Sequence, residues 1–183
     1  MLKSVAAAAV RPHLVVRPGG LRDVELVEAM HRRCSDLSLY RRFHAPLPRV
    51  SARMVRQMLT PNEGWSLLAQ QQGELGQREL GQGDVVGFAS VAPVSDSVVE
   101  VGLLVEDMHQ GQGLGTRLLY GVAMDAASRG YRALTCLTQP DNDAVLSTVR
   151  RAGLMGRVAW HDGLLQISIP VRRLSVSPAL LVG

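Results

Sequence analysis

The stretch "VVEVGLLVEDMHQGQGLGTRLLYGVAMDAASRG", residues 98–130, joins an apolar run to a segment with helical periodicity through a glycine turn. Residues 98–105 predict a buried strand, and the apolar repeat after the turn predicts a helix over 114–128, closed by Gly130. The first N–H groups of a helix have no intrahelical partner, and the helix dipole adds positive charge there. Glycines let the backbone close around phosphate oxygens, so the turn predicts an anion site.

Two common nucleotide loops do not fit this turn. A phosphate-binding loop of the GxxxxGK[ST] type needs a lysine, and none follows Gly115. The dinucleotide fingerprint GxGxxG needs an acidic residue at the end of the next strand, and "ALTCLT" at 133–138 has none. A glycine turn that only permits tight packing is the structural alternative.

The rest of the chain reads as one mixed α/β domain of about seven strands and about four helices. Strands are predicted near 13–20, 65–70, 85–94, 98–105 and 133–138, and a hairpin near 157–169 turns at Asp162–Gly163. Helices are predicted near 21–34, 51–59, 114–128 and 142–152. We expect a flexible leader over 1–12, the domain over 13–170, a solvated hairpin extension between 70 and 84, and a tail over 171–183.

Composition excludes several classes of protein. The net charge of +4 comes from basic residues scattered along the chain, so no nucleic-acid footprint is predicted. Two separated cysteines and five histidines without ligand spacing predict no metal site. The apolar run of six residues before Arg11 is shorter than the core of an export signal and cannot cross a bilayer. We therefore expect a cytoplasmic protein, monomeric or homodimeric.

The pattern Gln110-x-x-Gly113-x-Gly115 resembles the Q/R-x-x-G-x-G/A pyrophosphate loop of the GNAT (GCN5-related N-acetyltransferase) family. The order of predicted elements over roughly 14–170 is similar too, and Asn142 and Gly153 stand where that family opens and closes its next helix. The resemblance implies a sheet splayed at strand 98–105, and acetyl-CoA as cosubstrate. Two positions depart from the family pattern: Leu154 replaces a usual Phe, and Val149 replaces a tyrosine that in many members protonates the leaving thiolate.

The resemblance also implies a set of binding residues. Main-chain amides of the turn would hold the coenzyme A pyrophosphate, from Gln110, Gly111, Gln112, Gly113, Leu114, Gly115 and Thr116. Leu103 and Val105 would pair their backbone with pantetheine, and Asn142 would contact the pantetheine arm. A main-chain N–H on the same strand would polarise the thioester carbonyl.

Glu100 is the one charged residue between Val98 and Val105. An acid among valines must reach an edge, pair with a cation, or suffer a desolvation that raises its pKa. An amine acceptor arrives as an ammonium and needs a base before it can attack a thioester. We therefore predict Glu100 as the general base, with a solvated or Arg-paired side chain as the alternative.

The segment "RCSDLSLYRRF", 33–43, is similar to one in bacterial protein lysine acetyltransferases of the Pat type, which also lack the tyrosine and use a glutamate on the equivalent strand. By position it would wall the acceptor pocket, with Arg41 and Arg42 near the mouth. The alternative is a helix end with Tyr40 and Phe43 packed on the core. Arg117 could meet a coenzyme phosphate or stay solvated.

A protein lysine is thus the predicted acceptor. A small amine, such as a polyamine or an aminoglycoside, is the alternative within enzymes, and a non-catalytic acyl-CoA-binding module is the alternative outside them.

Overall fold

The computed structural model describes residues 14–47, 49–61, 63–72 and 83–171. The predicted leader, most of the predicted hairpin extension and the predicted tail from residue 172 onward lie outside the described residues.

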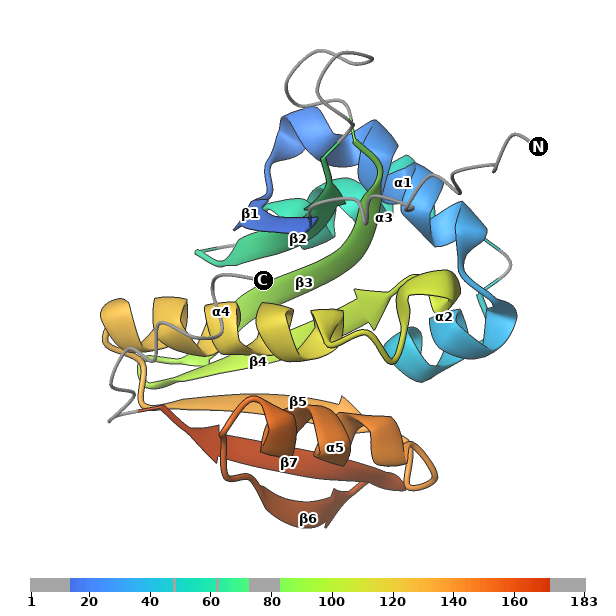
Figure 1. Cartoon of the computed structure of the whole chain (residues 1–183). Coiled ribbons are helices and arrows are strands. Elements are labelled where there is room, and N and C mark those ends of the chain that lie inside the picture. Colours follow the sequence, from blue (N-terminus) through green and yellow to red (C-terminus); the bar gives the residue numbers. More distant parts are fainter. Residues whose placement is uncertain (1–13, 48, 62, 73–82, 172–183) are drawn as a thin grey trace, which may run out of the picture.

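The described strands form a seven-stranded sheet in the order β1-β2-β3-β4-β5-β7-β6 (Figure 1). Their bounds are β1 Leu14–Pro18, β2 Trp65–Gln71, β3 Val85–Ser95, β4 Val98–Val105, β5 Ala133–Thr138, β6 Arg157–His161 and β7 Leu164–Pro170. Strands β4 and β5 are parallel, and the other neighbours are antiparallel. The predicted mixed sheet is therefore confirmed.

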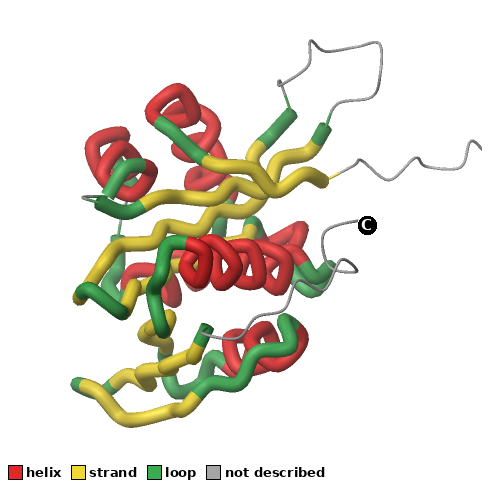
Figure 2. Tube along the Cα trace, turned by 90° about the vertical axis from the view of Figure 1, so that its left-hand side faces the viewer, coloured by secondary structure: helices red, strands yellow, loops and turns green. Residues whose placement is uncertain are grey.

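In the described part of the chain, five α-helices cover the two faces of this sheet. They are α1 Val24–Arg33, α2 Asp36–Phe43, α3 Ala52–Leu59, α4 Leu114–Ser128 and α5 Asp143–Arg151. Helices α4 and α5 pack with one apolar cluster on the near face in Figure 1, and α1, α2 and α3 pack with a second cluster on the other face. Figure 2, turned by 90°, shows helices on both sides of the strands. Helix α2 was not among the four predicted helices.

Short-range signals in the sequence set the ends of these elements. The hydroxyl of Ser51 accepts a hydrogen bond from the N–H of Met54 and caps α3. Gly130 and Gly153 follow α4 and α5 with φ of 88° and 70°, the left-handed region in which a side chain is disfavoured. Asp162 and Gly163 both have positive φ, which is typical of a two-residue hairpin turn.

Strands β4 and β5 separate after a short shared ladder. Only three residue pairs join them, Val98–Ala133, Val99–Leu134 and Glu100–Thr135. On its other side β4 stays paired with β3 as far as Val105. The sheet therefore opens after Glu100, which confirms the predicted splay of the strand over 98–105.

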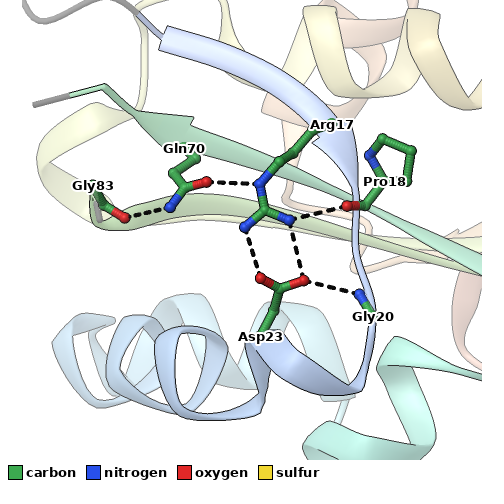
Figure 3. Close-up of polar contacts among 6 residues, drawn as sticks. All are labelled: Arg17, Pro18, Gly20, Asp23, Gln70 and Gly83. Atoms are coloured by element: carbon green, nitrogen blue, oxygen red, sulfur yellow. Dashed lines mark hydrogen bonds and ion pairs between the residues drawn. The ribbon is translucent and has the colours of Figure 1, made fainter. Parts of the chain in front are cut away.

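An ion pair fixes the entry of the chain into the first helices (Figure 3). The guanidinium of Arg17 on β1 binds both carboxylate oxygens of Asp23, at 2.7 and 3.1 Å, and donates to the side-chain oxygen of Gln70 at 2.6 Å. Asp23 also accepts from the N–H of Gly20 at 3.0 Å. Burial opposes the charge of Asp23, but these contacts with Arg17 and Gly20 outweigh it and lower the pKa of that carboxyl.

Replacing Asp23 by Ala should lower the free energy of unfolding at pH 7 by about 2–3 kcal/mol, because it leaves Arg17 unpaired against the sheet. A folded pKa below the unfolded one means that this stabilisation is complete above about pH 4 and is lost as the pH falls through the folded value. The difference between the two proteins in urea unfolding should therefore shrink as the pH falls below about 4. The matched change Glu28→Ala, in the more exposed ion pair with Arg32, should cost only about 0.5 kcal/mol; equal losses for the two variants would contradict the account.

Candidate functional site

A cavity of about 470 Å³ lies where β4 and β5 part, and we call it the splay cavity. Residues from five parts of the chain line it: α2 with His44 after it, the open half of β4, the glycine turn with the first turns of α4, the end of β5, and α5. Of the predicted site residues, the cavity is lined by Glu100, Leu103, Val105, Gln110, Gly111, Gly113, Gly115, Thr116 and Asn142. Gln112 and Leu114 are not among its lining residues; Leu114 is buried in the core instead.

The open half of β4 presents main-chain groups to this cavity. In an antiparallel ladder, every second residue bonds the neighbouring strand through its N–H and C=O groups. The residues between them point these groups to the opposite side. The N–H of Glu106 donates to the carbonyl of Val86 at 2.9 Å, so by alternation Leu104 also bonds β3. Leu103 and Val105 therefore turn their N–H groups toward the side that β5 has left.

The glycine turn presents a row of unpartnered N–H groups at the start of α4. The carbonyl of Gly113 accepts the first helical bond, from Arg117 at 3.0 Å. Among the described residues, no acceptor receives a hydrogen bond from the N–H groups of residues 111–116. Gly111 and Gly113 have φ of 73° and 84°, and a Cβ on either would point into open space. The turn therefore has the geometry of an anion cradle.

Gln110 departs from the predicted cradle. Its N–H already donates to the carbonyl of Asp107 at 3.2 Å, so the free amides begin at Gly111. Its side-chain amide donates to the carbonyl of Val105 at 3.0 Å and to the hydroxyl of Ser38 at 3.1 Å. Gln110 thus braces the turn against β4 and α2.

Asp107 extends this brace to α2. Its carboxylate accepts from the N–H and hydroxyl of Ser35 at 2.8 and 2.7 Å, and from the hydroxyl of Ser38 at 2.8 Å. Partial burial opposes its charge, but the hydrogen bonds from Ser35 and Ser38 outweigh burial and lower the pKa of Asp107. The two serines of the 33–43 segment therefore hold α2 over the glycine turn.

Glu100 reaches the opening in the sheet. Its side chain is exposed and not buried among the valines, because β5 leaves β4 at this residue. Of the three outcomes expected for an acid among valines, the structure shows the first, in which the side chain reaches an edge. Residues two apart on a strand share a face, so Glu100 lies on the same face as Gly102 and Leu104, which is the face covered by α1–α3.

A second cavity of about 280 Å³ adjoins the first on that face, and we call it the α3 cavity. Arg42, Phe43, Glu100 and Gly102 line both cavities. The rest of the α3 cavity is lined by Met54, Gln57, Met58, Pro61, Ser90 and Ala92. Glu100 therefore stands at the boundary between a cavity with a row of free main-chain donors and a largely apolar one.

The three tyrosines and Arg117 lie outside both cavities. Tyr40 is 41% exposed and lines neither cavity, whereas Tyr120 is buried in the core. Tyr131 packs against Trp65, with ring centroids 6.0 Å apart. Arg117 donates to the carbonyl of Leu14 at 3.0 Å. Val149, at the position where many GNAT proteins have a tyrosine, is buried and lines the splay cavity.

Sequence reasoning missed several residues that line the splay cavity, among them His44 and Thr138. His44 ends α2 in the left-handed conformation, and its buried Nδ1 has no hydrogen-bond partner among the described residues. Burial, and more weakly the charge of Arg42, lowers the pKa of His44 against opposing contributions from the Leu137 backbone and Glu100. The buried hydroxyl of Thr138, at the end of β5, likewise lacks a partner in the described part of the chain. No sequence pattern marks either residue.

Within the described residues, no group of three or more His, Cys, Asp or Glu side chains is arranged to hold a metal ion. No helix among these residues has the length and apolar character needed to span a bilayer.

A mixed sheet opened between two parallel strands, with a glycine turn at the opening, defines an acyltransferase class of α/β fold. The chain belongs to the acetyltransferase (GNAT) family, whose model matches residues 37–154. The GNAT domain of S. lividans PAT is similar over 85% of this chain and 89% of its own, with 27% identity and a TM-score of 0.70.

Two more distant structures share the fold. A GNAT superfamily phosphinothricin acetyltransferase from Sinorhizobium meliloti, in complex with AcCoA, is 17% identical, with a TM-score of 0.63 over 86% of this chain and 88% of its own. The yncA protein of Salmonella typhimurium, a putative acetyltransferase with its cofactor acetyl-CoA, is 19% identical, with a TM-score of 0.59 over 90% and 97%. A search of curated protein sequences gave no match.

Proposed function

We propose that this chain transfers an acetyl or other short acyl group from acetyl-CoA to a primary amine. The observation that carries the proposal is the row of unpartnered N–H groups at residues 111–116, at one end of a cavity that has Glu100 at its other boundary. The diphosphate of the coenzyme is the anion that this row would bind, and pantetheine would run along the open half of β4. Acetyl-CoA in the S. meliloti and S. typhimurium structures supports this ligand.

The residues of the site account for the chemistry in a definite order. Glu100 takes a proton from the acceptor ammonium, and the free amine attacks the thioester carbonyl. The N–H of Leu103, turned toward the cavity, donates to the developing oxyanion. The C–S bond then breaks to give the amide, and the thiolate takes the second nitrogen proton, directly or through water. No tyrosine is required, which fits Val149 at the family's tyrosine position.

The acceptor has two candidates. The 33–43 segment resembles that of Pat-type enzymes, and Phe43, Met54 and Met58 offer an apolar wall for the methylenes of a protein lysine. A small amine is the second candidate, and Arg42, which lines the α3 cavity together with Glu100, favours a small amine that also carries a carboxylate. A non-catalytic acyl-CoA-binding module would leave Glu100 without a role.

Incubation of the protein with a cell extract and labelled acetyl-CoA tests the proposal. We expect label in new amides, found by mass spectrometry on protein lysines or on small amines. The control is Gly113→Glu, which should add no label beyond that of the extract without added protein. Coenzyme A binding without any labelled amide would favour the non-catalytic module.

A further inference from the structure

We propose that the acceptor carries a carboxylate close to its amine, as a free α-amino acid does, and that Arg42 selects it in the α3 cavity. This inference rests on the proposed acyl transfer and names its substrate class.

The guanidinium of Arg42 is held in a fixed place on the sheet. Its Nη2 donates to the hydroxyl of Ser90 at 2.8 Å, and its guanidinium carbon lies 5.1 Å from the ring centroid of Phe43. It lies flat against Gly102, where a Cβ would collide with the guanidinium carbon and both terminal nitrogens. A charge held by these contacts loses little side-chain entropy when it binds a ligand.

One edge of this guanidinium remains available. Among the described residues Nη1 has no hydrogen-bond partner, and it is not one of the buried atoms, whereas Nε is buried and unpartnered. The ion pairs of the described residues do not include Arg42. Burial lowers the pKa of Arg42 to about 10, and Glu100 opposes this shift. A half-buried cation without a paired anion is costly, and a ligand carboxylate would relieve that cost.

Glu100 and Arg42 together match a zwitterion. The α3 cavity contains one carboxylate and one guanidinium among the residues that line it, with apolar walls from Phe43, Met54 and Met58. An α-amino acid presents an ammonium, a carboxylate and a side chain on one carbon, so each part meets a suitable partner. A polyamine or a lysine side chain would place a cation beside Arg42 without an anion to offset it. The volume of about 280 Å³ is also that of a compact ligand.

The test measures release of the coenzyme A thiol from acetyl-CoA with a panel of L-amino acids, each compared with its amide. L-leucine, L-leucinamide and 3-methylbutylamine share a side chain and differ at the carboxylate. A capped peptide with a single lysine represents the protein acceptor. We expect kcat/KM for the preferred amino acid to exceed that for its amide roughly tenfold to a hundredfold, as one charge-assisted recognition contact allows. At neutral pH a larger fraction of the amide is free amine, because its amine has the lower pKa, so a preference for the amino acid reports recognition and not the supply of free amine.

Two variants test whether Arg42 causes the preference for the amino acid over its amide. Arg42→Gln should reduce the ratio of kcat/KM for the amino acid to kcat/KM for its amide to about one. Stabilisation by coenzyme A shows that this variant is folded. Gly102→Ala keeps the charge but displaces the guanidinium, and it should lower the ratio as well. Arg53→Gln is the control, because Arg53 is an exposed arginine of α3 that lines neither cavity; it should keep the ratio.

Equal use of the amino acid and its amide by the unaltered protein would overturn the proposal, as would a ratio that Arg42→Gln leaves unchanged. Transfer to the lysine peptide alone would also overturn it while leaving the acyltransferase function intact. Absence of both turnover and coenzyme A binding would instead contradict the proposed acyl transfer itself.

Discussion

Gly113→Glu should abolish coenzyme A binding. Gly113 has a φ of 84°, so any side chain there is strained by roughly 1–2 kcal/mol. A Cβ at this position meets nothing within 4 Å, so the added carboxylate would extend into the space before the free N–H groups. There it would compete with the diphosphate and repel it. We expect the dissociation constant, measured by calorimetry, to rise at least a hundredfold, and thermal stabilisation by the coenzyme to disappear.

Gly130→Glu is the matched control for this variant. Gly130 has a φ of 88° and equally open surroundings, but it follows the opposite end of α4. Backbone strain should therefore lower the melting temperature similarly in both variants, while only Gly113→Glu loses coenzyme binding. Normal binding by Gly113→Glu would exclude the glycine turn as the diphosphate site.

Glu100→Gln should remove most acyl transfer at pH 7 and leave coenzyme A binding unchanged. The amide keeps the shape of the side chain but cannot accept the ammonium proton, and loss of a general base costs about 10²–10⁴-fold in rate. Free amine becomes abundant at higher pH, so the variant should recover part of its kcat there, whereas the unaltered protein should gain less. Steady-state rates from pH 6.5 to 10 measure this difference.

Asp96→Asn removes a carboxylate from the exposed turn before β4 and should leave both rate and pH profile unchanged. A Glu100→Gln variant with the full rate at pH 7 would remove Glu100 from the mechanism.

Much of the fold follows from local sequence signals. The helix over 114–128 was predicted with its observed ends, because an apolar stripe and a closing glycine coincide there. Helix α2 was missed although Ser35 caps it. It is only two turns long, and Leu37 and Tyr40 are 56% and 41% exposed, so its apolar residues do not form one buried stripe.

The candidate site was predictable in part, for a similar physical reason. The glycine turn is a local motif, and its free N–H groups follow from helix geometry at Gly113. The exposure of Glu100 depends on where β5 leaves β4, which is a tertiary property that an apolar pattern does not encode. The contact between Ser35 and Asp107 joins residues 72 positions apart, and the place of Arg42 depends on Gly102 in another element. These relations become visible only when the chain is folded.

A crystal structure of the protein with bound coenzyme A tests the central claim most directly. We predict the diphosphate within hydrogen-bond distance of N–H groups in residues 111–116, and pantetheine between β4 and β5 with its thiol end near Glu100. Coenzyme density at another surface, with the amides of the glycine turn contacting only solvent, would contradict the account.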